Sequence, residues 1–392
     1  MATLLAAAAF SFERPAHALD LGSEDSMASV EVHAFASQGF ILSKDNNYLS
    51  ADTTHGSFQF SELGVNLTKK LTDRFRVGLQ LFAQDLGPTG NYNVRADWFY
   101  LDYRFTNWLG VRAGRVKIPF GLYNESVDID SARAAVLLPQ SIYPEEDRNY
   151  LLAQTGGEVY GFANLRKAGG LDYSLYGGTI FVDTTQPAGS TEQITSFNVP
   201  YVAGGRLLWE TPLDGLRVGG SVQALRLDAS ILAGATAPSS PTTPATVSVQ
   251  IPVKLWVASA EYTAGDLVLS AEYSRWYVSD ETSNSAIFPS TPAITSERAY
   301  AMATYRAAPW LQPCVYYSVM FPDTTQRDGR QNVQHDVSTT LRFDLNSFWL
   351  LKLEGHYMFG TAGVDPSLNG GLPLASLAPA WGVLLVKTTA YF

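Results

Sequence analysis

The chain of 392 residues has a net charge of −10, only 16% charged residues and a single cysteine, Cys314. The negative charge disfavours nucleic acid as a partner, and one cysteine excludes an intramolecular disulfide and a cysteine-rich metal site. Aromatic residues make up 12% of the chain and glycines number 32, which suits a membrane β-barrel that is apolar outside and polar inside. A secreted soluble β protein is the alternative that composition leaves open.

The first eighteen residues are predicted to form an export signal. Residues 4–12 are a short apolar stretch, and an A-x-A cleavage signal follows at 16–18. The usual basic residues before the apolar stretch are missing, so an ordinary first helix remains the alternative. We expect a signal peptide over 1–18 and a single barrel domain over 19–392.

From residue 29 onward, polar and apolar side chains alternate, which is the period of a β-strand. In residues 335–345, Asp336 and Arg342 share one face, and Leu341 and Phe343 share the other. Charges in the middle of a strand suit a wall between lipid and a wet lumen. A soluble sandwich also alternates, so strand length and loop pattern must separate the two folds.

Sixteen stretches follow this pattern, and most exceed the about 5–6 residues of globular strands. They suit the about 9–11 residues that a tilted membrane strand needs. The predicted strands are 29–39, 57–69, 74–85, 94–105, 108–117, 154–166, 170–182, 200–210, 215–228, 251–263, 266–278, 297–307, 311–321, 335–345, 348–359 and 381–392.

The connections alternate between short turns, such as 106–107, and long loops, such as the Pro/Thr/Ser-rich 229–250. Short periplasmic turns and long extracellular loops are the layout of outer-membrane barrels. Aromatic residues flank the short turns, as in the girdle at a membrane interface. The sequence therefore predicts an all-β fold, a 16-stranded antiparallel transmembrane β-barrel. The flanking aromatic residues are Phe105, Trp108, Trp209, Trp310 and Trp349.

The last stretch, residues 381–392, is predicted to close the barrel by pairing with 29–39, because a membrane barrel leaves no open edge. Its alternation directs Lys387 to the lumen and Leu384 and Phe392 to lipid.

The longest connection, about 118–153, contains most of the candidate functional residues. We expect this third loop to fold inward and narrow the lumen, with charged residues opposite basic wall residues, so that it sorts solutes by size and charge. The alternative is a loop that only caps the outside. Residues 131–138 have helix-forming residues and are expected to make one or two turns before Pro139. The candidate constriction residues are Glu125, Asp128, Asp130 and Arg133 in the loop, and Arg74, Arg76, Arg104, Arg112, Arg342 and Lys352 in the wall.

The charges predicted to face the lumen are nearly balanced, and the third loop adds six acids and two bases. We therefore expect a weak cation preference or none. Arg115 and Lys117 share a face with outward residues, so either a bulge intervenes or they lie above the membrane.

Residues 108–125, WLGVRAGRVKIPFGLYNE, resemble the R-x-G-(x)-x-K-x-P-F-(G/S)-L-E signature of the phosphate-selective porin O/P family and related 16-stranded Gram-negative porins. The resemblance implies a trimeric diffusion channel whose third loop forms the constriction. Terminal Phe392 is similar to the aromatic residue that the outer-membrane assembly machinery recognises. The dense basic ladder of a phosphate filter is missing. The signature positions are Arg112, Gly114, Lys117, Pro119, Phe120 and Gly121.

We expect a porin of the bacterial outer membrane that passes small hydrophilic solutes and ions passively. Its expected partners are membrane lipid, lipopolysaccharide, the assembly machinery and two further copies in a homotrimer. No catalytic, metal or cofactor motif is apparent, and the five histidines are dispersed. The alternatives are a solute-specific channel, including one for anions or phosphate, and a sleeve around a partner protein.

Overall fold

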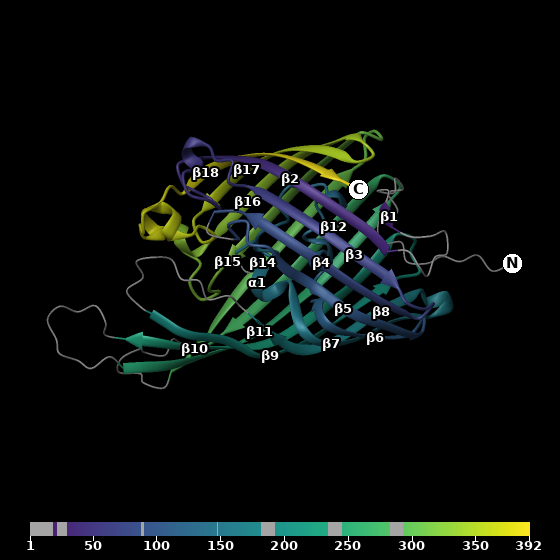
Figure 1. The fold of residues 1–392 in the computed structure, drawn as a ribbon. Coiled ribbons are helices and arrows are strands. Elements are labelled where there is room, and N and C mark those ends of the chain that lie inside the picture. The colour runs from purple at the N-terminus through teal and green to yellow at the C-terminus, as the bar shows by residue number, and fades with distance from the viewer. Residues whose placement is uncertain are drawn as a thin grey trace.

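The computed structural model describes residues 19–21, 30–87, 90–146, 148–181, 193–233, 245–282 and 293–392. Sixteen long strands pair antiparallel with their neighbours, and β18 pairs with β2 to close the barrel (Figure 1). The predicted signal peptide, 1–18, lies outside these ranges. In the described part of the chain, no helix is long and apolar enough to cross a membrane.

The barrel strands are β2 (Val30–Lys44), β3 (Ser61–Lys70), β4 (Phe75–Asp85), β5 (Arg95–Thr106), β6 (Leu109–Lys117), β7 (Ala153–Asn164), β8 (Gly170–Ile180), β9 (Gln193–Glu210), β10 (Leu216–Ala233), β11 (Ala245–Ala264), β12 (Leu267–Val278), β14 (Ile294–Tyr305), β15 (Leu311–Phe321), β16 (Gln334–Asn346), β17 (Trp349–Gly360) and β18 (Ala380–Tyr391). The short strands β1 (Leu19–Leu21) and β13 (Glu281–Thr282) pair with β2 and β11. The helices are short: α1 (Arg148–Leu151), η1 (Thr53–His55), η2 (Asn124–Ser126), η3 (Asp130–Ala132), η4 (Arg166–Ala168), η5 (Arg330–Asn332), η6 (Pro366–Asn369) and η7 (Leu374–Ser376).

The predicted sixteen-stranded antiparallel barrel is confirmed. Every predicted strand overlaps one barrel strand, and β15 has the predicted bounds. The prediction of a loop over 229–250 is wrong at both ends, because β10 and β11 continue pairing as far as Ala233 opposite Ala245. Alternation in the TVSVQ stretch supports this pairing, and it buries Val247 and Val249. In Figure 1, β9, β10 and β11 extend beyond the rest of the barrel.

Alternation directs one face of each strand to the interior. In β16, Asp336 is 4% exposed and Thr340 is fully buried, whereas Val337 and Leu341 are 44% and 40% exposed on the outer surface. The predicted girdle residues that flank the short turns are likewise exposed. The outer surface is thus apolar and the inner surface polar, which is the arrangement that a lipid environment requires.

The closing strand lies as the alternation predicts. Lys387 Nζ points inward and lies 2.6 Å from Glu62 Oε2, while Leu384 and Phe392 are exposed on the outside. The backbone of Phe392 exchanges hydrogen bonds with that of Ala34, at 3.0 and 3.2 Å. The last residue therefore extends the ladder that closes the barrel.

The third loop, residues 118–152 in the structure, lies inside the barrel, and α1 is seen within the ring of strands in Figure 1. The prediction of helical turns over 131–138 is wrong beyond η3. The peptide groups of this segment bond to wall side chains instead of to one another: Arg342 donates to the Ser131 carbonyl, and Glu354 accepts from the Val136 amide. These bonds satisfy the backbone in a non-helical path.

Candidate functional site

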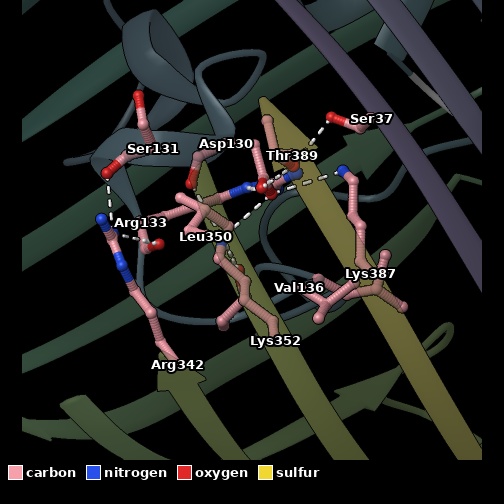
Figure 2. A network of polar contacts seen from close by, with 12 residues as sticks. Ser37, Asp130, Ser131, Arg133, Val136, Arg342, Leu350, Lys352, Lys387 and Thr389 are labelled. Atoms are coloured by element: carbon pink, nitrogen blue, oxygen red, sulfur yellow. Dashed lines mark hydrogen bonds and ion pairs between the residues drawn. The ribbon is translucent and has the colours of Figure 1, made fainter. Parts of the chain in front are cut away.

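The tip of the third loop carries a buried carboxylate at the centre of a charge network (Figure 2). Lys352 Nζ on β17 donates to Asp130 Oδ1 at 2.9 Å and to its carbonyl at 2.7 Å. Thr389 Oγ1 on β18 donates to Oδ2 at 2.6 Å, and Lys387 Nζ lies 3.3 Å from Oδ1. The side chains of Asp130, Lys352 and Lys387 have no exposed surface. Three cations, Lys352, Lys387 and Arg133, thus face Asp130. Lys387 also pairs with Glu62.

Burial by itself would raise the pKa of Asp130, but Lys352, Lys387 and Arg133 lower it well below its ordinary value. The carboxylate therefore stays charged across the neutral and mildly acidic range.

β16 and β17 also hold the backbone that follows Asp130. Arg342 Nη1 donates to the carbonyls of Ser131 and Arg133, at 2.7 and 3.1 Å. The Glu354 carboxylate accepts from the amides of Val136 and Leu137, at 2.6 and 2.9 Å. On this side of the barrel, charged wall residues fix the path of the loop.

The opposite side of the lumen holds the loop with hydroxyl groups and amides. Glu272 on β12 accepts from the Leu122 amide at 3.0 Å, from Tyr300 Oη at 2.9 Å and from Tyr143 Oη. Tyr123 Oη donates to Glu261 Oε2 at 3.0 Å. Buried apolar side chains surround these bonds, and they include Ile118, Phe120 and Ile142 of the loop and Val202, Leu225 and Leu255 of the wall.

The two ends of the loop are attached by further ion pairs. Asp128 pairs with Lys117 at the end of β6, and Lys117 and Arg148 lower its pKa although burial opposes them. Arg148 Nη1 and Nη2 donate to the Asp97 carboxylate on β5, at 3.1 and 2.9 Å. Glu125 lies 2.8 Å from Arg206 on β9. The third loop is therefore bound to strands all around the barrel.

Two cavities lie on either side of the third loop. The larger, the short-turn cavity, has a volume of about 720 Å³ and extends from Ala135 and Leu138 to the turn at Pro309. The smaller, the long-loop cavity, has about 190 Å³ and is lined by Ser141 and Tyr48. Between them, β14–β16 present a closed layer of side chains that are at most 3% exposed: Tyr300, Cys314, Tyr316, Ser338 and Thr340.

The structure brings four of the predicted constriction residues together, namely Asp130, Arg133, Arg342 and Lys352. Glu125 and Asp128 belong to the same loop but contact other strands. Arg112 pairs with Glu158 at 3.1 Å in the wall.

The remaining predicted residues lie near the short turns and not at the loop. Arg74 immediately precedes β4, Arg76 pairs with Asp102 at 2.8 Å, and Arg104 is exposed near the end of β5. The alternation along each strand predicted which face of the strand these residues occupy. It carries no information about their position along the barrel axis.

Lys117 and Arg115, whose direction the alternation left open, both reach polar partners. Lys117 Nζ donates to the Glu125 carbonyl at 2.6 Å, and Arg115 Nε donates to the Asp97 carbonyl at 2.7 Å. Gly114 precedes them with φ +132°, and a Cβ there would lie 2.4 Å from the Phe99 carbonyl oxygen. Only glycine fits this position.

Sequence reasoning did not predict that five residues hold the loop, although Lys117 belongs to the porin-like signature and Arg206, Glu261 and Glu272 were predicted to face the lumen. The five residues are Lys117, Arg206, Glu261, Glu272 and Thr389. The available signal was a polar residue on the inward face of a strand. Many positions in the sequence have this property. Which of them contact the loop depends on the path of the loop, which the sequence does not reveal.

No family model and no curated protein matches this sequence, so the expected membership of the phosphate-selective porin O/P family is not confirmed. Solved structures do match. OmpT of Vibrio cholerae is 12% identical with a TM-score of 0.58, over 95% of this chain and 100% of that one. Its in-vitro folded trimer form matches with 12% identity and a TM-score of 0.54, over 93% and 99%.

Two further structures have a similar fold. OmpF of Salmonella typhi, in complex with daunomycin, is 11% identical with a TM-score of 0.56, over 95% of this chain and 100% of that one. An anion-selective porin from Comamonas acidovorans is 13% identical with a TM-score of 0.54, over 93% and 99%. At these identities the likeness concerns the fold: this chain is a closed sixteen-stranded antiparallel barrel of the kind that outer-membrane porins adopt.

Proposed function

We propose that this protein is a porin of the bacterial outer membrane through which small hydrophilic solutes and ions diffuse passively. The observation that carries the proposal is the third loop, which folds back into a polar lumen and binds charged wall residues there. The apolar outer surface supports the same conclusion, because it suits contact with membrane lipid and lipopolysaccharide.

The third loop sets the size limit of the channel. Because the closed layer along β14–β16 separates the two cavities, solutes pass on that side only when the segment around 130–143 departs from the wall. Conductance then depends on how firmly the wall holds this segment.

The channel has little ion preference. Each acid of the candidate constriction has a basic partner: Lys117 for Asp128, Arg206 for Glu125, and Lys352 for Asp130. Paired charges contribute little net field to the aqueous route. A reversal potential near zero in a salt gradient is expected, and strong selectivity for either sign contradicts this part of the proposal.

Reconstitution tests the function as a whole. Purified protein in planar bilayers should give stepwise conductance, and liposomes that contain it should swell in small sugars but not in large ones. Protein-free membranes and heat-unfolded protein are the controls. Membranes that stay sealed, or hydrolysis of a lipid or peptide substrate by the purified protein, would overturn the assignment as a passive channel.

The other functions considered have unequal support. A sleeve around a partner protein is disfavoured because the third loop itself occupies the lumen. A solute-specific channel is the second candidate, and the arginine side chains of the short-turn cavity favour it.

Assembly as a homotrimer is part of the proposal, supported by the trimer form of the structurally similar OmpT. Native mass measurement in detergent tests it, and a monomer under mild extraction contradicts it.

We also propose that the outer-membrane assembly machinery recognises Phe392, whose side chain is exposed at the end of the closing strand. Deletion of Phe392 should lower the amount of inserted barrel several-fold but leave single-channel conductance unchanged. Quantitative blotting of membranes together with bilayer recording measures both. If the deletion variant is inserted in the same amount as the wild type, the assembly machinery does not recognise Phe392.

A further inference from the structure

The short-turn cavity has the size of a ligand site. Its volume of about 720 Å³ falls in the range of about 300–1,000 Å³ that is usual for small-molecule pockets. Ala135 and Leu138 of the third loop form one wall, and Pro309 and Ser347 of two short turns lie at the other end. A solute entering from the short-turn side reaches this cavity before it reaches the closed layer.

Arg133 lines this cavity, and two of its side-chain nitrogen atoms have no hydrogen-bond partner among the described residues. The residue is 7% exposed, and its buried Nε and Nη1 have no hydrogen-bond partner. Its nearest carboxylate oxygen, Asp130 Oδ1, lies 3.7 Å from Nε and already accepts from Lys352. A buried, unsatisfied donor is costly, and a charged one more so.

Two more arginines line the same cavity. Arg342 Nη2 and Arg306 Nη1 pair with the two oxygens of Asp344, at 2.8 and 3.2 Å. The charged lining residues are Arg133, Arg306 and Arg342 against Asp266 and Asp344, which gives 3 − 2 = +1. The cavity thus favours an anion with a single charge.

The rest of the lining is largely apolar. Tyr123, Leu138, Val268 and Met302 face the cavity together with the alanines of the loop. An inorganic anion would leave this surface in contact with water. A ligand with an apolar body covers it and gains the free energy of burial.

We infer that the short-turn cavity binds a small organic monoanion, with a carboxylate that accepts hydrogen bonds from Arg133 and an apolar or aromatic body against Leu138 and Met302. The site deepens the proposed channel function by naming a solute class, although binding itself does not require conduction.

Calorimetric titration of benzoate into the detergent-solubilised protein tests the inference. Benzoate should bind, whereas benzyl alcohol, which has the same ring without the charge, and inorganic phosphate, which has charge without the ring, should bind at least about tenfold more weakly. Equal binding of phosphate would overturn the organic ligand, and equal binding of benzyl alcohol would overturn the carboxylate contact.

Two variants test separately the charge of Arg133 and the space for the ring of the ligand. Arg133→Met should weaken benzoate binding about tenfold or more through loss of charge-assisted hydrogen bonds. Met302→Trp should block the ring while it retains every arginine. Arg74→Met, at an exposed turn, is the matched control. Unchanged binding in both cavity variants would refute the site, and thermal unfolding of each variant verifies folding.

The readout also distinguishes this inference from the channel proposal. Sealed liposomes combined with benzoate binding would refute the channel and retain the site. Conducting bilayers without benzoate binding would retain the channel and refute the site.

Discussion

The third loop is held on two opposite sides of the lumen by different chemistry. Toward β16–β18, a few fully buried charges centred on Asp130 fix its tip. Toward β10–β12, hydroxyl groups around Glu272 and a large apolar cluster hold both of its ends. A buried charge pair is sensitive to the loss of one partner, since the other is left uncompensated. Truncation of one side chain in an apolar contact surface costs the transfer free energy of the removed atoms and a cavity term, while the other apolar contacts remain. The charged side is therefore the one expected to release first.

Removal of the central charge is the strongest test of this difference. Asp130→Asn leaves Lys352, Lys387 and Arg133 buried near one carboxylate, Glu62, and should destabilise the attached loop by about 3–5 kcal/mol. The expected results are a lower unfolding temperature and faster sugar uptake by liposomes. In the double variant Asp130→Asn/Lys352→Met one of the uncompensated cations is removed together with the carboxylate, so much of the loss should be recovered. If the double variant loses more stability than the two single variants together, the explanation by charge is contradicted.

Acid should weaken the charged side through protonation of Asp130. The pKa of Asp130 is lowered in the folded protein, so its contribution to stability is present above the ordinary pKa of about 3.9. That contribution is lost as pH falls through the lower folded pKa. Swelling rates should stay constant from about pH 7 to 5 and rise only below about pH 4. Asp130→Asn should flatten this dependence, whereas a transition near pH 6 would point to another group.

A substitution on the uncharged side should have a smaller effect. In Glu272→Gln, one oxygen becomes a donor that faces other donors, the Tyr143 and Tyr300 hydroxyls or the Leu122 amide. The expected cost is about 1–3 kcal/mol. The apolar cluster should still hold the loop, so the unfolding temperature should fall while conductance changes less than in Asp130→Asn. Equal conductance changes in the two variants would remove the distinction between the two sides.

Strand parity in the sequence predicted much of this architecture. It placed Lys387 in the lumen and Leu384 outside, and it gave sixteen strands, although β2, β9, β10 and β11 are five or more residues longer at one end than predicted. It could not predict which inward residues lie at the height of the loop, so Arg74 and Arg104 were grouped with Lys352. Nor could it predict the path of residues 131–138, because helix propensity there is overridden by wall side chains that bind the backbone.

The length of β10 and β11 also could not be predicted from the sequence alone. The proline- and threonine-rich composition of 229–250 suggested a loop, although its last residues alternate as a strand does. Pairing across the hairpin, which is a tertiary property, decided the outcome.

The central claim, that the third loop limits passage, can be tested with a tether. Ala135 of the loop and Cys314 of β15 are buried in one cluster, so Ala135→Cys introduces a second thiol into the cluster that holds the native one. Single-channel conductance of this variant should be low when oxidised and should return to the wild-type value on reduction. Ala135→Cys/Cys314→Ser, in which no bond can form, should not respond to reduction. If mass spectrometry finds the disulfide and the oxidised and reduced forms conduct equally, the loop does not limit passage and the account is wrong.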